Sequence, residues 1–141
     1  MSEIQHQFVK KILTSASHGA YEKGRGLAPS NIALCKYWGK RDTTLNLPLN
    51  SSLSISLGEK GTCTQIRRVP NDQFILNGEP IDPATPFAQR LSTFLELFRE
   101  PCRAPGFEVI TDNTIPTAAG LASSASGYAA LVLALNDLAG W

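Results

Sequence analysis

Residues 116–127 read PTAAGLASSASG and lie between a predicted strand at 107–111 and a predicted helix at about 123–138. Nearly all of these side chains are small, so the backbone can approach a ligand closely. The free N–H groups at the start of the next helix, at the positive end of its dipole, suit a phosphate. The stretch lacks the G-K-[ST] ending of a Walker loop. A tight loop that leads into a well-packed helix with a serine N-cap explains the same letters, so composition alone leaves both interpretations open.

The segments before this loop alternate between strand and helix patterns. In residues 51–57, apolar Leu53, Ile55 and Leu57 alternate with serines, which indicates a strand with one apolar face. Asn77-Gly78 after a short apolar run indicates a hairpin. Residues 87–99 carry an apolar stripe that is typical of a core helix, and Pro101 should end it. Strands are predicted at residues 32–35, 51–57, 62–69, 74–76 and 107–111, with 62–69 pairing with 51–57. The pattern predicts an α+β fold, a mostly antiparallel sheet packed by helices.

The first 26 residues differ from the rest and are interpreted as an N-terminal extension before a domain at 27–141. Ile4, Phe8, Ile12 and Leu13 have helical spacing, which predicts a short amphipathic helix over 4–13. Gly24-Arg25-Gly26 is interpreted as a connector of small residues. We expect both histidines, His6 and His18, to be solvated, since neither has a recognisable carboxylate partner.

A second candidate anion site lies at residues 28–42, which read APSNIALCKYWGKRD. Lys36, Lys40 and Arg41 lie within six residues in a chain that has few charges, and Tyr37 adds a hydroxyl donor. If these side chains converge, they suit a polyanion such as a diphosphate. The alternative is a solvated turn in which Asp42 neutralises Arg41.

Composition restricts the class of protein. The 141 residues carry 13 basic and 12 acidic side chains, a formal charge of +1, which gives no general attraction to nucleic acid or to an anionic membrane. Hydrophobic residues make up 43%, which favours a globular chain. The spacing of the three cysteines argues against disulfides and structural zinc, and neither a signal peptide nor a long apolar run is evident. We therefore expect a cytoplasmic protein. Residues 129–141 are strongly apolar, so further chain is expected to follow them.

Four blocks resemble one family. AP at 28–29 with NIA at 31–33, KYWGKRD at 36–42, LNLPLNSSLS at 45–54 and PTAAGLASSA at 116–125 are similar to the diphosphomevalonate decarboxylases, in the GHMP kinase superfamily. The resemblance covers residues 27–141. It implies a partial GHMP-type N-terminal domain and a lyase of the mevalonate pathway of isoprenoid biosynthesis. The implied reaction is ATP-dependent decarboxylation of (R)-5-diphosphomevalonate to isopentenyl diphosphate, with release of ADP, phosphate and CO2.

The same resemblance implies the roles of individual residues. Asn31 and Ser124 would be catalytic, and Lys36, Tyr37 and Lys40 would hold the substrate diphosphate. Magnesium would bridge the phosphates of ATP, although no metal ligand is assignable. The implied ATP-binding residues are Asn113, Pro116, Thr117, Ala118, Ala119, Gly120, Leu121, Ala122, Ser123 and Ser124.

The aspartate that acts on the substrate hydroxyl in the family is expected to lie outside this chain, together with the C-terminal domain. Asp42, Asp112 and Asp137 do not match its motif. The chain alone is therefore predicted to be inactive, with mevalonate 5-diphosphate, the remaining polypeptide and a second copy in a homodimer as its expected partners. Two alternatives stay open: a GHMP small-molecule kinase or monophosphate-specific decarboxylase, and a non-catalytic domain derived from such an enzyme.

Overall fold

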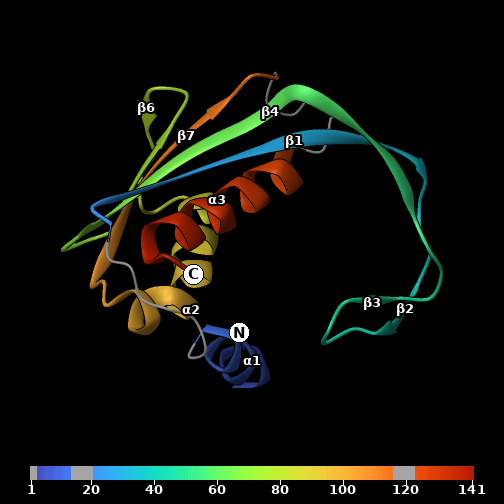
Figure 1. Cartoon of the computed structure of the whole chain (residues 1–141), viewed down its shortest axis with the longest axis horizontal. Coiled ribbons are helices and arrows are strands. Elements are labelled where there is room, and N and C mark those ends of the chain that lie inside the picture. Colours follow the sequence, from blue (N-terminus) through green and yellow to red (C-terminus); the bar gives the residue numbers. More distant parts are fainter. Residues whose placement is uncertain (1–2, 14–20, 116–122) are drawn as a thin grey trace.

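A computed structural model of the chain describes residues 3–13, 21–115 and 123–141. A five-stranded sheet in the order β1-β4-β7-β5-β6 has α2 and α3 packed on one face (Figure 1). Neighbouring strands run antiparallel except β5 and β7, which are parallel. The elements are α1 (Glu3–Leu13), β1 (Lys23–Cys35), β2 (Lys40–Asp42), β3 (Leu47–Pro48), β4 (Leu53–Val69), β5 (Gln73–Leu76), β6 (Glu79–Pro80), α2 (Pro86–Cys102), β7 (Gly106–Asn113) and α3 (Ser123–Ala139). The predicted α+β fold with a mostly antiparallel sheet is confirmed.

Strand β1 begins at Lys23, so the prediction of a connector at Gly24-Arg25-Gly26 is wrong. Burial alternates along the first part of this strand, with Gly24, Gly26, Ala28 and Ser30 turned inward. A Cβ atom added at Gly24 or Gly26 would lie 2.1 Å from a backbone carbonyl oxygen of α3. The missing side chains thus let the helix lie directly against the strand. Strand β1 also crosses the predicted boundary at residue 26.

Strand β4 is continuous from Leu53 to Val69, so the two predicted strands at 51–57 and 62–69 do not pair with each other. Both halves pair with β1 instead. The register shifts between the pairs Pro29–Gly61 and Asn31–Ser56, which leaves Ser30 and residues 57–60 between them. Gly58 has a φ of 62°, a conformation that glycine adopts without steric cost. Beyond this irregularity the two strands form a long curved arm that ends in the β2–β3 ribbon (Figure 1). We call residues 31–57 the arm.

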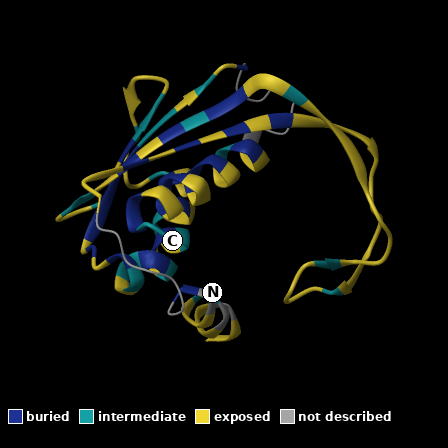
Figure 2. Cartoon of the chain, viewed as in Figure 1, coloured by how far each residue is buried: buried dark blue, intermediate teal, exposed yellow. Residues whose placement is uncertain are grey.

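The core lies between the helices and the inner face of the sheet. Its fully buried side chains include Ile66 of β4, Leu95 of α2, Phe107 of β7 and Leu135 of α3. In Figure 2 the buried residues, in dark blue, are concentrated in this body of helices and sheet, whereas the arm is almost entirely exposed. Core burial of apolar area supplies the main driving force for folding the body.

The local predictions for the helices and the hairpin are largely confirmed. Helix α1 covers the predicted 4–13 segment, and His6 is exposed as expected, whereas His18 lies outside the described residues. Asn77 and Gly78 have φ angles of 51° and 82°, as the β5–β6 turn requires. Helix α2 includes Pro101 and ends one residue later at Cys102, where Arg103 in the left-handed conformation caps it. None of the described helices has the length and hydrophobicity to cross a membrane.

Candidate functional site

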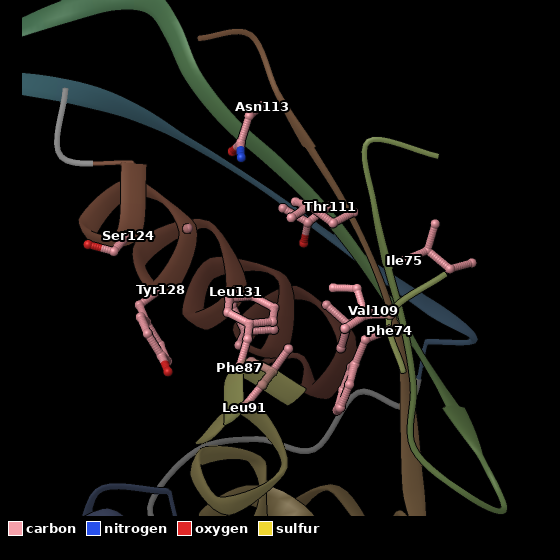
Figure 3. Close-up of a pocket in the computed structure, with 13 residues that line it drawn as sticks. Phe74, Ile75, Phe87, Leu91, Val109, Thr111, Asn113, Ser124, Tyr128 and Leu131 are labelled. Atoms are coloured by element: carbon pink, nitrogen blue, oxygen red, sulfur yellow. The ribbon is translucent and has the colours of Figure 1, made fainter. Parts of the chain in front are cut away.

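A cavity of about 220 Å³ opens between α2, α3 and the strands β5 and β7 (Figure 3). Its walls are mainly apolar, and Phe74, Leu91, Val109 and Leu131 belong to them. Polar atoms enter from Thr111 and Asn113 on β7 and from Ser124 in the first turn of α3. The lining residues are Phe74, Ile75, Leu76, Ile81, Phe87, Leu91, Val109, Thr111, Asn113, Ser124, Gly127, Tyr128 and Leu131.

Two of the predicted nucleotide residues, Asn113 and Ser124, meet at this cavity although 11 positions separate them in the sequence. Ser123 begins helix α3. The other predicted residues of that set, Pro116, Thr117, Ala118, Ala119, Gly120, Leu121 and Ala122, lie outside the described residues. The cavity therefore adjoins both ends of the predicted phosphate loop.

The loop's entry point is held by Thr114. Its backbone N–H donates to the Gly61 carbonyl oxygen at 2.9 Å, and its Oγ1 accepts from the Gly61 N–H at 2.8 Å. This pair of bonds attaches the end of β7 to the point where β4 changes register. The strand that leads into residues 116–122 thus has a defined position.

Four buried or half-buried polar side chains meet beside the cavity. The Ser30 hydroxyl donates to Ser126 Oγ at 3.1 Å, Ser126 Oγ and Thr62 Oγ1 are 2.9 Å apart, and the Thr62 hydroxyl donates to Asn113 Oδ1 at 2.7 Å. Ser30, Thr62 and Ser126 are at most 3% exposed. We call these four residues the hydroxyl chain. The sequence analysis did not identify Thr62, since a lone threonine in a strand carries no motif.

The predicted substrate residues lie on the arm, none of whose residues lines the cavity, and the arm extends away from the helices α2 and α3 (Figure 1). Asn31 is exposed on β1, and its Nδ2 donates to Ser54 Oγ at 3.2 Å. Lys36 and Tyr37 follow the end of β1, and Lys40 begins β2. All three side chains are exposed, so they are available to a ligand.

Asparagine side chains organise the end of the arm. The Lys40 ammonium donates to Asn46 Oδ1 at 2.7 Å, and the Trp38 N–H donates to Asn50 Oδ1 at 2.9 Å. Both asparagines fall in the LNLPLNSSLS block, which was noted for its resemblance only. Asp42 Oδ1 accepts the Leu45 N–H at 2.9 Å and so shapes the turn that follows β2.

Phe87 differs from its expected place on the core-facing stripe of helix α2. It is 44% exposed and lines the cavity, whereas Leu91, Leu95 and Phe98 of the same stripe are buried. Since Phe87 lies in the first turn of α2, the helix presents its N-terminal aromatic ring to the cavity and its later apolar residues to the core.

Cysteine and metal chemistry receive no support from the described residues. The three cysteines are free, and burial raises the pKa of the Cys102 thiol to about 11, which keeps it protonated at neutral pH. Within residues 3–13, 21–115 and 123–141, no three His, Cys, Asp or Glu side chains gather where they could hold a metal ion.

Comparisons with known proteins place this chain in a family. Residues 28–141 match the family model described as the diphosphomevalonate decarboxylase-like N-terminal domain. The chain therefore belongs to this family.

Individual relatives give the same result. The chain is 43% identical over 131 residues to diphosphomevalonate decarboxylase mvd1 of Aspergillus fumigatus, an alignment that covers 79% of this chain and 32% of that protein. Mevalonate diphosphate decarboxylase from Staphylococcus aureus superposes with a TM-score of 0.73 at 40% identity, over 83% of this chain and 36% of that one. The enzyme MDDEF in complex with MVAPP, AMPPCP and magnesium superposes with a TM-score of 0.68 at 40% identity, over 84% and 37%. The chain spans about a third of the length of these relatives.

Proposed function

We propose that this chain provides the ATP-binding and diphosphate-binding part of an enzyme that decarboxylates (R)-5-diphosphomevalonate to isopentenyl diphosphate, with release of ADP, phosphate and CO2. The observation that carries the proposal is the cavity beside helix α3. It joins apolar walls to the start of that helix, and Asn113 and Ser124 line it.

The apolar walls of the cavity and the N-terminal end of helix α3 beside it suit the two ends of a nucleotide. A nucleobase is flat and largely apolar, which suits walls built from Phe74, Val109 and Leu131. Phosphates require N–H donors and positive potential, which the N-terminal end of α3 supplies close to Ser124. We therefore assign the base to the apolar part and the phosphates to the end at residues 116–124.

Magnesium fits this site only through the nucleotide. The ion prefers phosphate oxygens and water, and the described residues offer no carboxylate cluster for it. When bound with ATP, Mg²⁺ would spread the negative charge that develops during phosphoryl transfer. Ser124 belongs to this proposed phosphate end, and its hydroxyl would hydrogen-bond to the transferring group.

The arm supplies the proposed substrate site. Lys36 and Lys40 offer ammonium groups and Tyr37 a hydroxyl to the diphosphate, and all three side chains are exposed. Asn31 would orient the substrate near its reacting carbon. Phosphorylation makes the tertiary hydroxyl of the substrate a good leaving group, and loss of the carboxylate then provides the electrons for the new double bond. The proposed partners are the substrate, ATP with Mg²⁺ and the polypeptide that accounts for the rest of the relatives' length, in the cytoplasm.

The activity is tested by measuring ATP-dependent and Mg²⁺-dependent CO2 release from mevalonate 5-diphosphate. The assay uses the complete polypeptide that carries this chain, or this chain combined with the remaining part of a relative. A stable phosphorylated product without CO2 would indicate a kinase instead. Zero turnover by folded protein would disprove the proposed activity.

The diphosphate assignment is tested separately with Lys36→Ala. Loss of a charged hydrogen bond to the diphosphate should raise the KM for mevalonate 5-diphosphate about 10- to 100-fold. Lys23→Ala is the matched control, because Lys23 is an exposed lysine at the start of β1, whereas Lys36 follows the other end of that strand. An unchanged KM in the Lys36→Ala variant would support the alternative interpretation of the lysine cluster as a solvated turn.

A further inference from the structure

The hydroxyl chain places a donor against the Asn113 carboxamide. Each hydroxyl carries one hydrogen, and the Thr62 hydroxyl donates its hydrogen to Asn113 Oδ1. Ser126 Oγ lies 2.9 Å from Thr62 Oγ1 and accepts from Ser30 at 3.1 Å, so hydroxyl groups of α3 and β1 lie behind Thr62. The hydrogen bond between Thr62 and Asn113 therefore runs from β4 to β7.

This direction determines what Asn113 can offer to a ligand. Its carboxamide oxygen accepts from Thr62, and its backbone N–H donates to Asn77 Oδ1 at 2.8 Å. The side chain lines the cavity, and Figure 3 shows its carboxamide extending from β7 toward that space. The oxygen is held by Thr62 on its β4 side, and the NH2, a pure donor, is the group that we assign to the ligand.

Burial makes this arrangement specific. Thr62 is 0% exposed and lies directly opposite Asn113 in the β4–β7 register, so its hydroxyl has no water to substitute for the amide oxygen. A rotation of the carboxamide by 180° would place NH2 against Thr62 and replace the hydrogen bond of the structure, in which Thr62 donates to Asn113 Oδ1. Removal of the Thr62 hydroxyl would leave the amide oxygen without this donor.

We infer that Thr62 is a positioning residue of the proposed nucleotide site: through its hydroxyl it holds the Asn113 carboxamide so that the NH2 group donates to an acceptor atom of the bound nucleotide. This inference rests on the proposed function, because it takes the cavity as the ATP site. The hydroxyls of Ser126 and Ser30 extend the cluster behind Thr62 to helix α3 and strand β1.

The test is a double-mutant cycle between Thr62 and Asn113, read out as the affinity of the whole chain for Mg-ATP by calorimetry. Thr62→Val keeps the shape of the side chain and removes its hydroxyl. It should weaken binding about fivefold to tenfold, the effect of one hydrogen bond. In the Asn113→Ala background the same change should alter affinity less than about twofold, since the group that Thr62 orients is gone.

Two further variants separate positioning from stability. Thr62→Ser retains the hydroxyl and should bind ATP within about twofold of the unmodified chain. Ser126→Ala removes the next hydroxyl at a helix position where alanine is favourable, so it tests the inference even where Thr62→Val does not fold. It should weaken binding by about twofold or more, and again only while Asn113 is present.

Binding of adenosine and of inorganic triphosphate shows which part of ATP accepts the hydrogen bond. If Thr62→Val weakens adenosine binding, the acceptor is on the base or ribose; if it weakens triphosphate binding, the acceptor is a phosphate oxygen.

The failures of the inference and of the proposed function are distinguishable. Absence of Mg-ATP binding by the unmodified, folded chain would overturn the proposed nucleotide site and this inference with it. Binding by the unmodified chain, combined with an equal loss from Thr62→Val whether or not Asn113 is present, would overturn the inference alone. Full affinity in the Thr62→Val variant would do the same.

Discussion

Gly24 and Gly26 determine how closely helix α3 approaches strand β1. A Cβ atom at Gly26 would lie 2.1 Å from the Ala130 carbonyl oxygen and 2.6 Å from the Ala134 amide nitrogen, which are backbone atoms that cannot rotate away. The Arg25 N–H between the two glycines donates to Asp137 Oδ2 at 2.8 Å. The packing of strand β1 against helix α3 therefore depends on individual residues. Since α3 also carries Ser124 and Ser126, these glycines set the distance between those two serines and strand β1.

Gly26→Ala should destabilise the chain by about 1–3 kcal/mol, because the added methyl group forces the helix away from the strand. Gly127→Ala is the opposite case, because a Cβ atom added at Gly127 in helix α3 would have no atom within 4 Å. It should stabilise by about 0.5–1 kcal/mol through helix propensity. Urea unfolding followed by circular dichroism measures both changes. Equal stability of Gly26→Ala and the unmodified chain would contradict the close packing.

At the scale of elements, Asp72 connects helix α2 to the sheet. Its carboxylate accepts hydrogen bonds from Ser92 at 2.6 Å and from the Phe107 N–H at 3.0 Å, and Arg99 Nη2 lies 2.8 Å from it. Burial opposes ionisation of Asp72, but these hydrogen bonds and the Arg99 charge outweigh it and lower the pKa of the carboxyl group below its ordinary value of 3.8. The helix that presents Phe87 to the cavity is thereby attached to β7 at its other end.

The lowered pKa of Asp72 predicts a loss of stability in acid. Because the pKa is lower in the folded chain than in the unfolded one, the contribution is complete above the ordinary value of 3.8 and is lost as pH falls through the folded-state pKa. Asp72→Asn should cost about 1–3 kcal/mol at neutral pH, and its difference from the unmodified chain should narrow below about pH 4.

Unfolding by denaturant at a series of pH values measures this dependence. Ser92→Ala keeps the carboxyl group and removes one donor, so it should reduce the acid-dependent part without abolishing it. A constant difference between Asp72→Asn and the unmodified chain from neutral pH down to about pH 3 would rule out the assigned role of the carboxylate.

At the scale of the whole molecule, the chain consists of a body with a core and an arm with little burial. Trp38 is 82% exposed, and Leu49, Leu53 and Ile55 are each more than half exposed. Figure 2 shows this contrast along β1 and β4, which have buried residues alternating with exposed ones in the body and are almost entirely exposed in the arm. The proposed diphosphate residues Lys36, Tyr37 and Lys40 lie in this exposed arm. Hydrogen bonds of Asn46 and Asn50 and the pairing of β2 with β3 hold the end of the arm.

Hydrogen exchange should separate the two parts. Amides of the arm, residues 31–57, should exchange faster than those of residues 62–69 and of α3 by about a factor of 10 or more, because low burial permits local opening. Mass spectrometry after timed labelling of the chain at low concentration measures this difference. Equal protection of the arm and the body would show that the arm is covered in solution, and sizing at the same concentration would identify self-association.

Local patterns predicted much of the fold. Helical spacing located α1 and α2, an Ala- and Leu-rich composition located α3, Asn77-Gly78 located the β5–β6 turn, and strand patterns located the two ends of β4. The pattern did not predict the first half of β1, since Gly24, Gly26 and Ala28 alternate in size rather than in hydrophobicity. It also missed that residues 51–57 and 62–69 form one strand, because pairing partners are chosen by contacts far apart in sequence.

The sequence alone predicted the α+β class from its strand and helix patterns, and the resemblance of four blocks implied the type of domain. It also indicated the two segments to which chemistry is assigned, because these depend on residue types at short spacing: small residues before a helix, and lysines beside a tyrosine. Only the tertiary structure decided that Asn113 and Ser124 share a cavity, that Phe87 lines it and that Thr62 faces the Asn113 amide. These relations join different strands and helices, and the packing of α2 and α3 against the sheet creates them. A hydrogen bond between residues 51 positions apart leaves no periodic trace in the chain.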